Sequence, residues 1–343
     1  MRAFAIVFAA VVVLAASDGQ TQNSGDTLER FDAAFDALVG ENVEVEILHE
    51  EADTFFEGPV WHHRPEGGFL TFSDLVNNRI RKWDPETGGI SDYVAPVWTG
   101  NDSSSAIHFE RDGRSFAQIG PNGQTLDDMG RLVFAAMGSG RIMRREDDGS
   151  ITVLANAFEG RHLNAPNDLV YKSDGALYFT DIRVGLVTED ENPPDGVPHT
   201  GVYRLKDGAP TLLVSDLQAP NGIALSPDET VLYVNDIRTR DLMRYDLQAD
   251  GSLANGRVLL AIPRSETRPG NPDGMKIDVH GNIWNSGPGG IWVISPEGEH
   301  LGTILLPERI TNLAWGDSDA KALYATGPTM VTRVRVNVTG VRP

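Results

Sequence analysis

The sequence predicts an all-β protein, a six-bladed β-propeller preceded by a short N-terminal helix. Turn residues are abundant, with 36 Gly and 20 Pro in 343 residues, and the 40% of hydrophobic residues can form a large core. Strand-turn-strand segments of similar sequence occur six times. They recur at intervals of roughly 40 to 60 residues, which is typical of repeat architectures.

The chain begins with a segment typical of export signals. Residues 1–17, MRAFAIVFAAVVVLAAS, join a basic residue to an apolar run that is too short to span a bilayer. We predict a signal peptide cleaved near Ala16 and Ser17, and a periplasmic or secreted mature protein; an uncleaved membrane anchor is the alternative. The sequence contains no cysteine, so core packing must stabilise the fold without disulfides.

Residues 18–42 are predicted to form a linker and one short amphipathic helix. The apolar residues of DTLERFDAAFDALVG that follow helical spacing are Leu28, Phe31, Phe35 and Leu38. Gly40 is suited to end this helix. The propeller domain then occupies residues 43–343. Its first segment, VEVEIL, alternates like a strand and is expected to close the ring by pairing with the last blade, which would otherwise leave exposed edges.

The six repeats share one plan. Each begins with a short polar residue, runs through an apolar strand, turns around Asp or Gly, and enters a second strand with a bulky apolar residue. The segments are EGPVWHHRPEGGFLTFS, NGQTLDDMGRLVFAA, NDLVYKSDGALYFT, NGIALSPDETVLYVN, DGMKIDVHGNIWNS and TNLAWGDSDAKALYAT. A β-helix would need a shorter period, and a sandwich would not repeat its first residue, so the pattern favours a propeller.

The first residues of the repeats, which we call the ring residues, are Glu57, Asn122, Asn167, Asn221, Asp273 and Thr311. Because the inner strands of a propeller line one channel, these side chains should converge on its axis. They offer only oxygen donors with a charge of about −2, which suits Ca²⁺ better than Zn²⁺. Most of them have a plainer explanation, because Asn-Gly, Asn-Asp and Asp-Gly are common turn dipeptides and PNG at 220–222 reads as a tight turn. Glu57 is a poor turn residue and favours the metal interpretation.

Charge and missing motifs exclude several function classes. The formal charge of −20 repels nucleic acids and anionic membranes, so neither is an expected partner after signal cleavage. The sequence lacks the Gly-x-Ser-x-Gly, His-Glu-x-x-His and phosphate-loop motifs of serine hydrolases, zinc proteases and nucleotide-binding proteins. The histidines, including His62, His63 and His162, are expected outside the set of metal ligands. The sequence does not indicate an oligomeric state.

Several motifs resemble one known family. FEGPVW at 56–61, LNAPNDLVYKSDGALYFTD at 163–181, APNGIALSPDE at 219–229 and NPDGMKIDVHGNIW at 271–284 resemble the gluconolactonase and senescence-marker-protein (regucalcin) family, and SGPGGIWVISPEGEHLG with NLAWG resembles its bacterial lactonase branch. The resemblance implies a six-bladed propeller that binds one divalent cation, usually calcium, in its channel. The family's ligands fall on Glu57, Asn167, Asn221 and Asp273. Calcium-dependent diisopropyl-fluorophosphatase and the drug-responsive lactonase look similar, so the resemblance indicates the site more closely than the substrate.

The ring and the resemblance together predict a calcium-dependent hydrolase that opens a lactone ring. Calcium, or another divalent ion, would polarise the carbonyl group while a carboxylate activates water. We favour Asp273 as this base, and Asp168 is the alternative. A metal-dependent esterase or phosphotriesterase is a second candidate function, and a noncatalytic ligand-binding propeller is a third.

Three further residues, Asn122, Asp168 and Arg183, are expected to contact a small-molecule lactone or ester substrate. Arg183 lies at the start of the acidic, Pro-rich loop 182–200, which is predicted to act as a lid. Family members commonly carry a Pro-Pro-Tyr-Gly-like turn where this chain has IRVG, and mammalian members carry an arginine at the position of Ala165. The first difference exchanges an aromatic surface for a cation, so a preference for sugar lactones does not follow from the resemblance.

Overall fold

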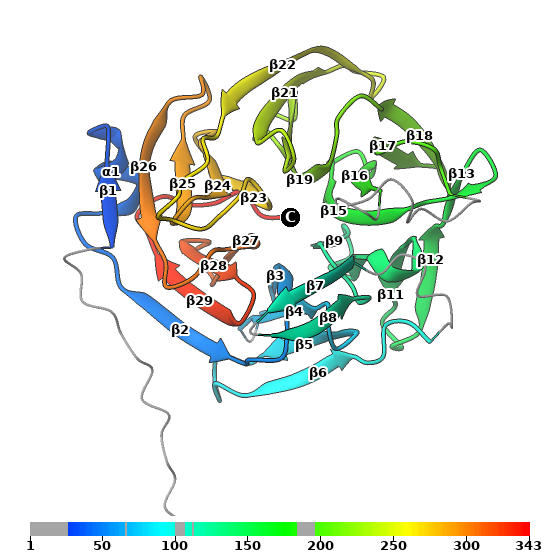
Figure 1. Ribbon diagram of the computed structural model, residues 1–343, viewed down its shortest axis with the longest axis horizontal. Coiled ribbons are helices and arrows are strands. Elements are labelled where there is room, and N and C mark those ends of the chain that lie inside the picture. Colours follow the sequence, from blue (N-terminus) through cyan, green and yellow to red (C-terminus); the bar gives the residue numbers. More distant parts are fainter. Residues whose placement is uncertain (1–26, 66, 100–106, 112, 184–195) are drawn as a thin grey trace, which may run out of the picture.

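The computed structural model describes residues 27–343 except 66, 100–106, 112 and 184–195. Six antiparallel sheets surround one axis, and the last residues of the chain lie beside that axis (Figure 1). This arrangement confirms the predicted six-bladed β-propeller. The predicted export signal, residues 1–17, lies outside the described residues. Within the described part of the chain, no helix has the length and apolar character needed to cross a membrane.

Each of the first three blades contains four strands, which follow one another from the axis outward. Blade one contains β3 (Phe56–His62), β4 (Phe69–Asp74), β5 (Arg79–Trp83) and β6 (Ile90–Val94). Blade two contains β9 (Gln124–Leu126), β10 (Leu132–Ala136), β11 (Arg141–Arg145) and β12 (Ile151–Ala155). Blade three contains β15 (Ala165–Tyr171), β16 (Leu177–Ile182), β17 (Gly201–Lys206) and β18 (Ala209–Val214).

The last three blades follow the same order, with additions at the N-terminus. Blade four contains β19 (Pro220–Leu225), β20 (Val231–Asp236), β21 (Asp241–Leu247) and β22 (Leu253–Ala261). Blade five contains β23 (Met275–Ile277), β24 (Ile283–Gly287), β25 (Gly290–Ile294), β26 (His300–Leu305) and the outermost β1 (Leu28–Arg30). Blade six contains β27 (Asn312–Gly316), β28 (Ala322–Thr326), β29 (Met330–Arg335) and β2 (Val45–Glu50). Two hairpins lie outside the blades: β7 (Ile107–Arg111) with β8 (Arg114–Gln118), and β13 (Ala157–Phe158) with β14 (Arg161–His162).

The strand β2 closes the ring, as the sequence predicts. It pairs antiparallel with β29, and Val45 lies opposite Val334 while Glu50 lies opposite Met330. An ion pair between Arg333 Nη2 and Glu46 Oε2, at 2.6 Å, joins the same two strands. The sixth blade is therefore built from both ends of the propeller sequence, and β2 covers the edge that β29 would otherwise leave unpaired.

The predicted N-terminal helix is shorter than expected. Of residues 27–42, which the structure describes, only α1 (Ala34–Val39) is helical, and it ends at Gly40, whose φ of 105° suits glycine. Leu28 belongs instead to β1, where it lies opposite Ile304 of β26. The spacing of apolar residues could not separate these two structures, because Leu28 of the edge strand packs into the same core cluster as Phe35 and Leu38 of the helix. Phe35 is fully buried against blade five, whereas Phe31 is 61% exposed and contacts the ring of His300.

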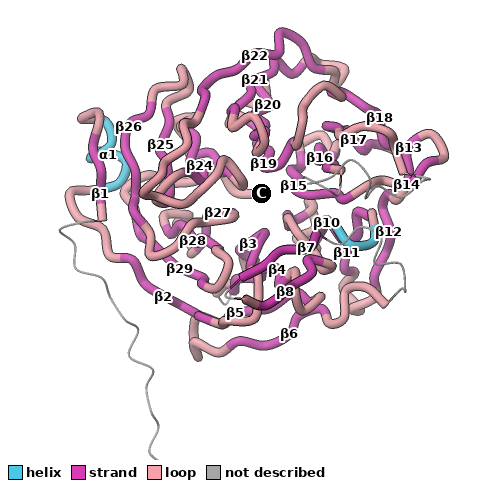
Figure 2. Tube along the Cα trace, in the orientation of Figure 1, coloured by secondary structure: helices cyan, strands magenta, loops and turns pink. Residues whose placement is uncertain are grey.

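Large aromatic side chains fill the spaces between neighbouring blades. Trp284 of β24 meets Trp315 of β27 edge to face, with ring centroids 5.1 Å apart. Trp61 of β3 stacks on Tyr324 of β28 at 5.2 Å, so blades six and one are joined in the same way. Among the residues that the structure describes, Figure 2 shows strand and loop, with helix only at α1 and at the 3₁₀ turn η2 (Met137–Ser139). Packing between blades, without helical layers, therefore forms the core.

The burial of Phe35 gives a test of how the N-terminal segment docks. Phe35→Ala should lower the free energy of unfolding by about 3 to 5 kcal/mol, because it opens a cavity between α1 and blade five. Phe31→Ala is the matched control and should change it by less than about 1 kcal/mol, because this ring is mostly exposed. Urea unfolding followed by tryptophan fluorescence measures both values. Equal effects of the two variants would contradict the docking of Phe35 on blade five.

Candidate functional site

The ring residues lie at one end of the channel because each stands at or just before the start of an inner strand. Glu57, Asn167 and Asn221 lie within β3, β15 and β19, and Asn122, Asp273 and Thr311 precede β9, β23 and β27. Five of the six are at most 5% exposed, while Asp273 is partly exposed. The structure thus places the six ring residues at equivalent ends of the inner strands, as the repeat register predicts.

Hydrogen bonds between neighbouring blades connect the ring positions. The amide of Gly123 donates to Asn167 O at 2.8 Å, that of Gly222 donates to Asp273 O at 3.0 Å, and that of Gly274 donates to Thr311 O at 2.7 Å. A Cβ atom at Gly222 would lie 2.1 Å from Asp273 O, and one at Gly58 would lie 2.2 Å from Asn122 O. Only glycine permits this approach of one backbone to the next.

This close approach corrects the interpretation of PNG at 220–222 as a tight turn. Pro220, Asn221 and Gly222 belong to strand β19, and its pairing with β20 shifts register between Pro220 and Ile223. The same irregularity occurs after Glu57 in β3 and around Asn167 in β15. A bulge of this kind changes the direction of a side chain within a strand, which is how the ring side chains come to face the axis.

Buried polar side chains of the second strands hold the ring backbone. Ser73 Oγ donates to Asn122 O at 2.6 Å, Thr180 Oγ1 donates to Asn221 O at 2.7 Å, and Asn235 Nδ2 donates to Asp273 O at 2.7 Å. Sequence reasoning missed these three residues. A signal was present, because each one directly precedes an aspartate at the end of its strand, in the pairs SD, TD and ND.

The aspartates of these pairs brace the segments that lead into the ring. Asp181 accepts the backbone amides of Asn164 at 3.0 Å and Ala165 at 2.7 Å. Asp236 accepts those of Gln218 and Ala219 in the same way. Burial raises the pKa of Asp181 to about 7 despite its two amide donors. These contacts fix the backbone just before Asn167 and Asn221, and so determine where those side chains point.

Three carboxylates meet at the ring, those of Glu57, Asp168 and Asp273. Burial raises the pKa of Glu57 well above its usual range, and the negative charges of Asp273 and Asp168 raise it further. Loss of hydration also raises the pKa of Asp273, although the cation of Arg309 opposes this shift. Burial raises the pKa of Asp168 too. The site therefore concentrates negative charge where water cannot screen it, and a bound cation would relieve this repulsion.

Amide oxygens at the ring also lack partners. Asn122 Oδ1 and Asn221 Oδ1 are buried without a hydrogen-bond donor, although the Asn122 amide nitrogen reaches Met137 Sδ at 3.5 Å. A buried oxygen without a partner costs about 1 to 3 kcal/mol, and a metal ion would satisfy it. No group of three or more histidine, aspartate or glutamate side chains in the described ranges is arranged to hold a metal by itself. A cation at the ring would thus use amide oxygens together with the carboxylates, as the oxygen-only set of Glu57, Asn167, Asn221 and Asp273 does.

Thr311 departs from the expected oxygen ring. Its hydroxyl donates to Phe56 O at 2.8 Å and lies within the wall between blades six and one. The next residue faces the carboxylates instead, because Asn312 Nδ2 lies 3.3 Å from Asp168 Oδ2. Residues 317–321 join β27 to β28 in a turn of the same length as those of blades two to five, so turn length did not reveal that the residue facing the carboxylates in this blade is Asn312 and not Thr311.

The remaining predicted residues occupy different places. Asp168 is 1% exposed beside Asn167, and its carboxylate accepts the Leu169 amide at 2.9 Å. Arg183 directly follows β16 at the ring end of blade three, and its guanidinium donates to Pro198 O at 3.4 Å. Residues 184–195, which include most of the predicted lid, lie outside the described residues.

The histidine nearest in sequence to Glu57 supports the wall rather than the ring. His62 is buried, and its Nε2 contacts Thr71 Oγ1, which in turn donates to Gln124 Oε1 at 2.8 Å. Burial lowers the pKa of His62 to about 3, so this side chain is neutral at physiological pH. Gln124 Nε2 then donates to Ser73 Oγ, so the network continues to the backbone of Asn122.

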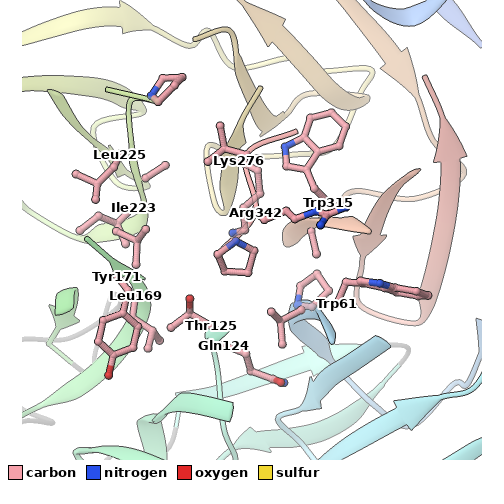
Figure 3. A pocket seen from close by; sticks show the side chains of 18 of the residues that line it. Trp61, Gln124, Thr125, Leu169, Tyr171, Ile223, Leu225, Lys276, Trp315 and Arg342 are labelled. Atoms are coloured by element: carbon pink, nitrogen blue, oxygen red, sulfur yellow. The ribbon is translucent and has the colours of Figure 1, made fainter. Parts of the chain in front are cut away.

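The inner strands continue from the ring into a cavity of about 120 Å³ inside the channel. Figure 3 shows side chains from all six inner strands around it, among them Gln124, Leu169, Ile223 and Lys276. Trp61 and Trp315 lie on one side of it, and Arg342 from the end of the chain reaches its border. A largely apolar cavity therefore lies beneath the ring. Lys276 lines this cavity on the side that faces the ring, where it contacts Asn312.

Comparisons with known proteins agree with this geometry. Residues 55–328 match the family model described as the SMP-30/Gluconolactonase/LRE-like region. A gluconolactonase from Zymomonas mobilis is 33% identical, over 98% of this chain and 94% of the relative. The solved structure of a gluconolactonase from Xanthomonas campestris has a TM-score of 0.77 and 28% identity, over 94% of this chain and 99% of that one. A calcium-binding regucalcin from Agrobacterium tumefaciens shares the fold, with a TM-score of 0.67 and 20% identity, over 87% of this chain and 95% of that one.

The raised pKa values predict how the stability of the metal-free protein depends on pH. Asp181 and Asp273 have folded-state pKa values of about 7 against ordinary values of 3.8, so the folded state binds more protons than the unfolded state between these limits. Its free energy of unfolding must then fall as pH rises through the folded pKa. The buried histidines oppose this only below their ordinary pKa of 6.5. Between pH 6.5 and about 8.5, the melting temperature in a chelating buffer should therefore decrease.

The control for this experiment is Asp181→Asn, which removes one titrating group away from the ring. Its melting temperature should decrease less steeply with pH than that of the wild type. A melting temperature that rises over the same range would mean that these carboxylates are more stable as buried anions than as neutral acids.

Proposed function

The chain belongs to the SMP-30/gluconolactonase/LRE-like family, and from this premise we propose that it is a calcium-dependent hydrolase that opens lactone rings at the ring residues. Its lactonase relatives support lactone hydrolysis and a small-molecule lactone substrate. The dependence on calcium and the roles of individual residues are our own proposal. The observation that carries it is the buried, unpartnered oxygen of Asn221 beside three carboxylates.

Glu57, Asn167, Asn221 and Asp273 are the proposed ligands of one divalent cation. Two carboxylates and two amides offer oxygen ligands and negative charge, both of which suit Ca²⁺. Because Ca²⁺ takes about six to eight ligands, four side chains leave coordination positions for water and substrate. When bound, the cation supplies polarisation of the lactone carbonyl and stabilises negative charge on its oxygen. The role of the fold is to hold these oxygens in place through the backbone contacts of Gly222 and Asn235.

Solvent exposure supports Asp273 as the general base. Asp273 is partly exposed at the mouth of the channel, whereas Asp168 is 1% exposed. The Asp273 carboxylate can accept a proton from water while the water oxygen bonds to the carbonyl carbon. It can then return that proton to the ring oxygen as the carbon–oxygen bond breaks, which leaves the hydroxy acid as product. Asp168, together with Asn122, is proposed to contact the substrate.

Two alternative functions would use the same site: hydrolysis of another substrate class, and ligand binding without catalysis. An ester or phosphotriester would use the same polarised oxygen, so either is an alternative substrate class. A noncatalytic ligand-binding propeller would bind calcium without turnover.

Export to the periplasm or medium is proposed from the composition of residues 1–17 alone. N-terminal sequencing of the protein from a cell that expresses the full chain would show an intact Met1 if this proposal is wrong.

The experiment for the proposed function is removal and return of the metal. A panel of sugar lactones, aliphatic lactones, aryl esters and phosphotriesters is assayed before chelation, after chelation, and after addition of Ca²⁺ or Mg²⁺. We expect lactone hydrolysis that chelation abolishes and Ca²⁺ restores. Full activity in exhaustively chelated protein that contains no divalent ion by elemental analysis would overturn the metal proposal. Calcium binding without turnover of any substrate would favour the ligand-binding alternative.

A pair of variants separates the two candidate bases. Asp273→Asn keeps an oxygen and nearly the same shape but cannot take a proton, so kcat at saturating Ca²⁺ should fall by about 10²- to 10⁴-fold. Asp168→Asn should act mainly through KM, since Asp168 is proposed to contact substrate. Both are measured at saturating Ca²⁺, because Asp273→Asn also removes an anionic ligand. If Asp273→Asn keeps a near-normal kcat while Asp168→Asn is inactive, Asp168 is the general base and Asp273 is not.

A further inference from the structure

Lys276 lies directly beneath the carboxylates of the ring. It belongs to β23, three residues after Asp273, and it lines the channel cavity between Ile223 and Trp315 (Figure 3). Its Nζ atom lies 3.0 Å from Met275 O and 3.3 Å from Asn312 Oδ1. Its positive charge also opposes the upward shift of the Asp168 pKa. A half-buried lysine in this position requires an explanation, because removing an ammonium group from water is costly.

The contact with Asn312 fixes which way that amide points. Asn312 Oδ1 accepts the backbone amide of Leu313 at 2.8 Å and the ammonium of Lys276 at 3.3 Å. A lysine can only donate, so the oxygen must face Lys276 and the amide nitrogen must face away. That nitrogen lies 3.3 Å from Asp168 Oδ2, and the Asn312 side chain also bonds to Glu57. One amide group thus reaches two of the three carboxylates.

Packing leaves the Asn312 side chain little room to move. A Cβ atom at Gly274 would lie 2.1 Å from Asn312 Cγ, so only glycine at this position leaves room for the Asn312 amide. The other Asp168 oxygen accepts the amide of Leu169 at 2.9 Å. Asp168 is therefore held at both oxygens, once by its own backbone and once by Asn312.

We propose that Lys276 is a positioning residue that acts through Asn312 to hold the Asp168 carboxylate ready for substrate. The inference rests on the proposed function, because it concerns a substrate contact of that site. Without the ammonium, Asn312 keeps one donor to its oxygen but loses the cation that prevents its amide from turning over. Asp168 would then face an amide oxygen in part of the molecules, and the two oxygens would move apart because both can only accept hydrogen bonds. Lys276 contacts none of the four proposed metal ligands directly. Glu57, which Asn312 also reaches, keeps its hydrogen bond from the Gly58 amide, so the main effect should fall on substrate rather than on calcium.

The test compares Lys276→Met with Arg342→Met. Both replace a cation that borders the same cavity, but Arg342 is exposed and its guanidinium donates to Ser318 O, away from the ring. Lys276→Met should lower kcat/KM by about 10- to 100-fold, the range found when a partner that orients a site residue is lost. Most of this loss should appear in KM. Arg342→Met should leave both constants unchanged.

Calcium affinity distinguishes positioning from general damage. Isothermal titration of metal-free protein with Ca²⁺ should give a Kd for Lys276→Met equal to or lower than that of the wild type, because a cation near the metal position has been removed. A higher Kd for Ca²⁺ together with the loss of activity would mean that the variant disturbs the whole ring, and would overturn the inference. Lys276→Arg retains the charge and a donor, and it should recover part of the lost activity.

A double-mutant cycle tests whether Lys276 acts on Asp168. If it does, Lys276→Met should add little to the KM of Asp168→Asn, since the group that it positions is already altered. Additive effects would show that Lys276 acts elsewhere. If the wild type turns over a substrate and Lys276→Met has the same kcat and KM, this inference is wrong and the proposed function stands. A wild-type protein without turnover of any substrate would remove the proposed function, and this inference with it.

Discussion

The close approach of one inner strand to the next is the constraint on which the rest of the site depends. Backbone amides of Gly123, Gly222 and Gly274 bond to ring carbonyls of the following blade, and a Cβ atom at these positions would collide with that blade. The contact brings side chains that are about 50 residues apart in sequence into one narrow plane. Because β2 and β29 close the ring, no blade can move outward without breaking its contacts on both sides.

This constraint has an energetic consequence at the axis. Three carboxylates meet with little water, and two amide oxygens are buried without donors. Each such oxygen costs about 1 to 3 kcal/mol, so the ring alone gives up a sizeable part of the roughly 5 to 15 kcal/mol that stabilises an ordinary domain. A structural role does not account for this cost, because apolar residues would fill the same plane with a smaller loss of stability. A bound cation would satisfy the Asn221 oxygen and the negative charges together, and a donor group of the substrate would satisfy the Asn122 oxygen.

The sequence was sufficient for the fold and for most of the ring, because both depend on a pattern that repeats. Residues that do not repeat could not be found in this way. Lys276 and Asn312 are unique to their blades, and their importance depends on a contact between β23 and β27 that only the folded chain reveals. The PNG segment was misread for a different reason: turns and bulges select the same residues, since both need a backbone without a bulky side chain. The predicted N-terminal helix is too long because Leu28 of the edge strand packs into the same core cluster as Phe35 and Leu38, so the apolar pattern does not show where the helix begins.

The three carboxylates differ in their surroundings, and these differences assign them different work. Glu57 is buried and bonded to the amide of its own neighbour Gly58, which suits a fixed ligand. Asp168 is held at both oxygens and shielded from water, so it can fix a substrate but has poor access to a reacting water molecule. Asp273 alone of the three keeps partial exposure. Loss of hydration raises its pKa, and the cation of Arg309 limits this rise. Environment therefore separates ligand, substrate contact and base among groups of the same chemistry, in the way that paired carboxylates in other hydrolases take different roles.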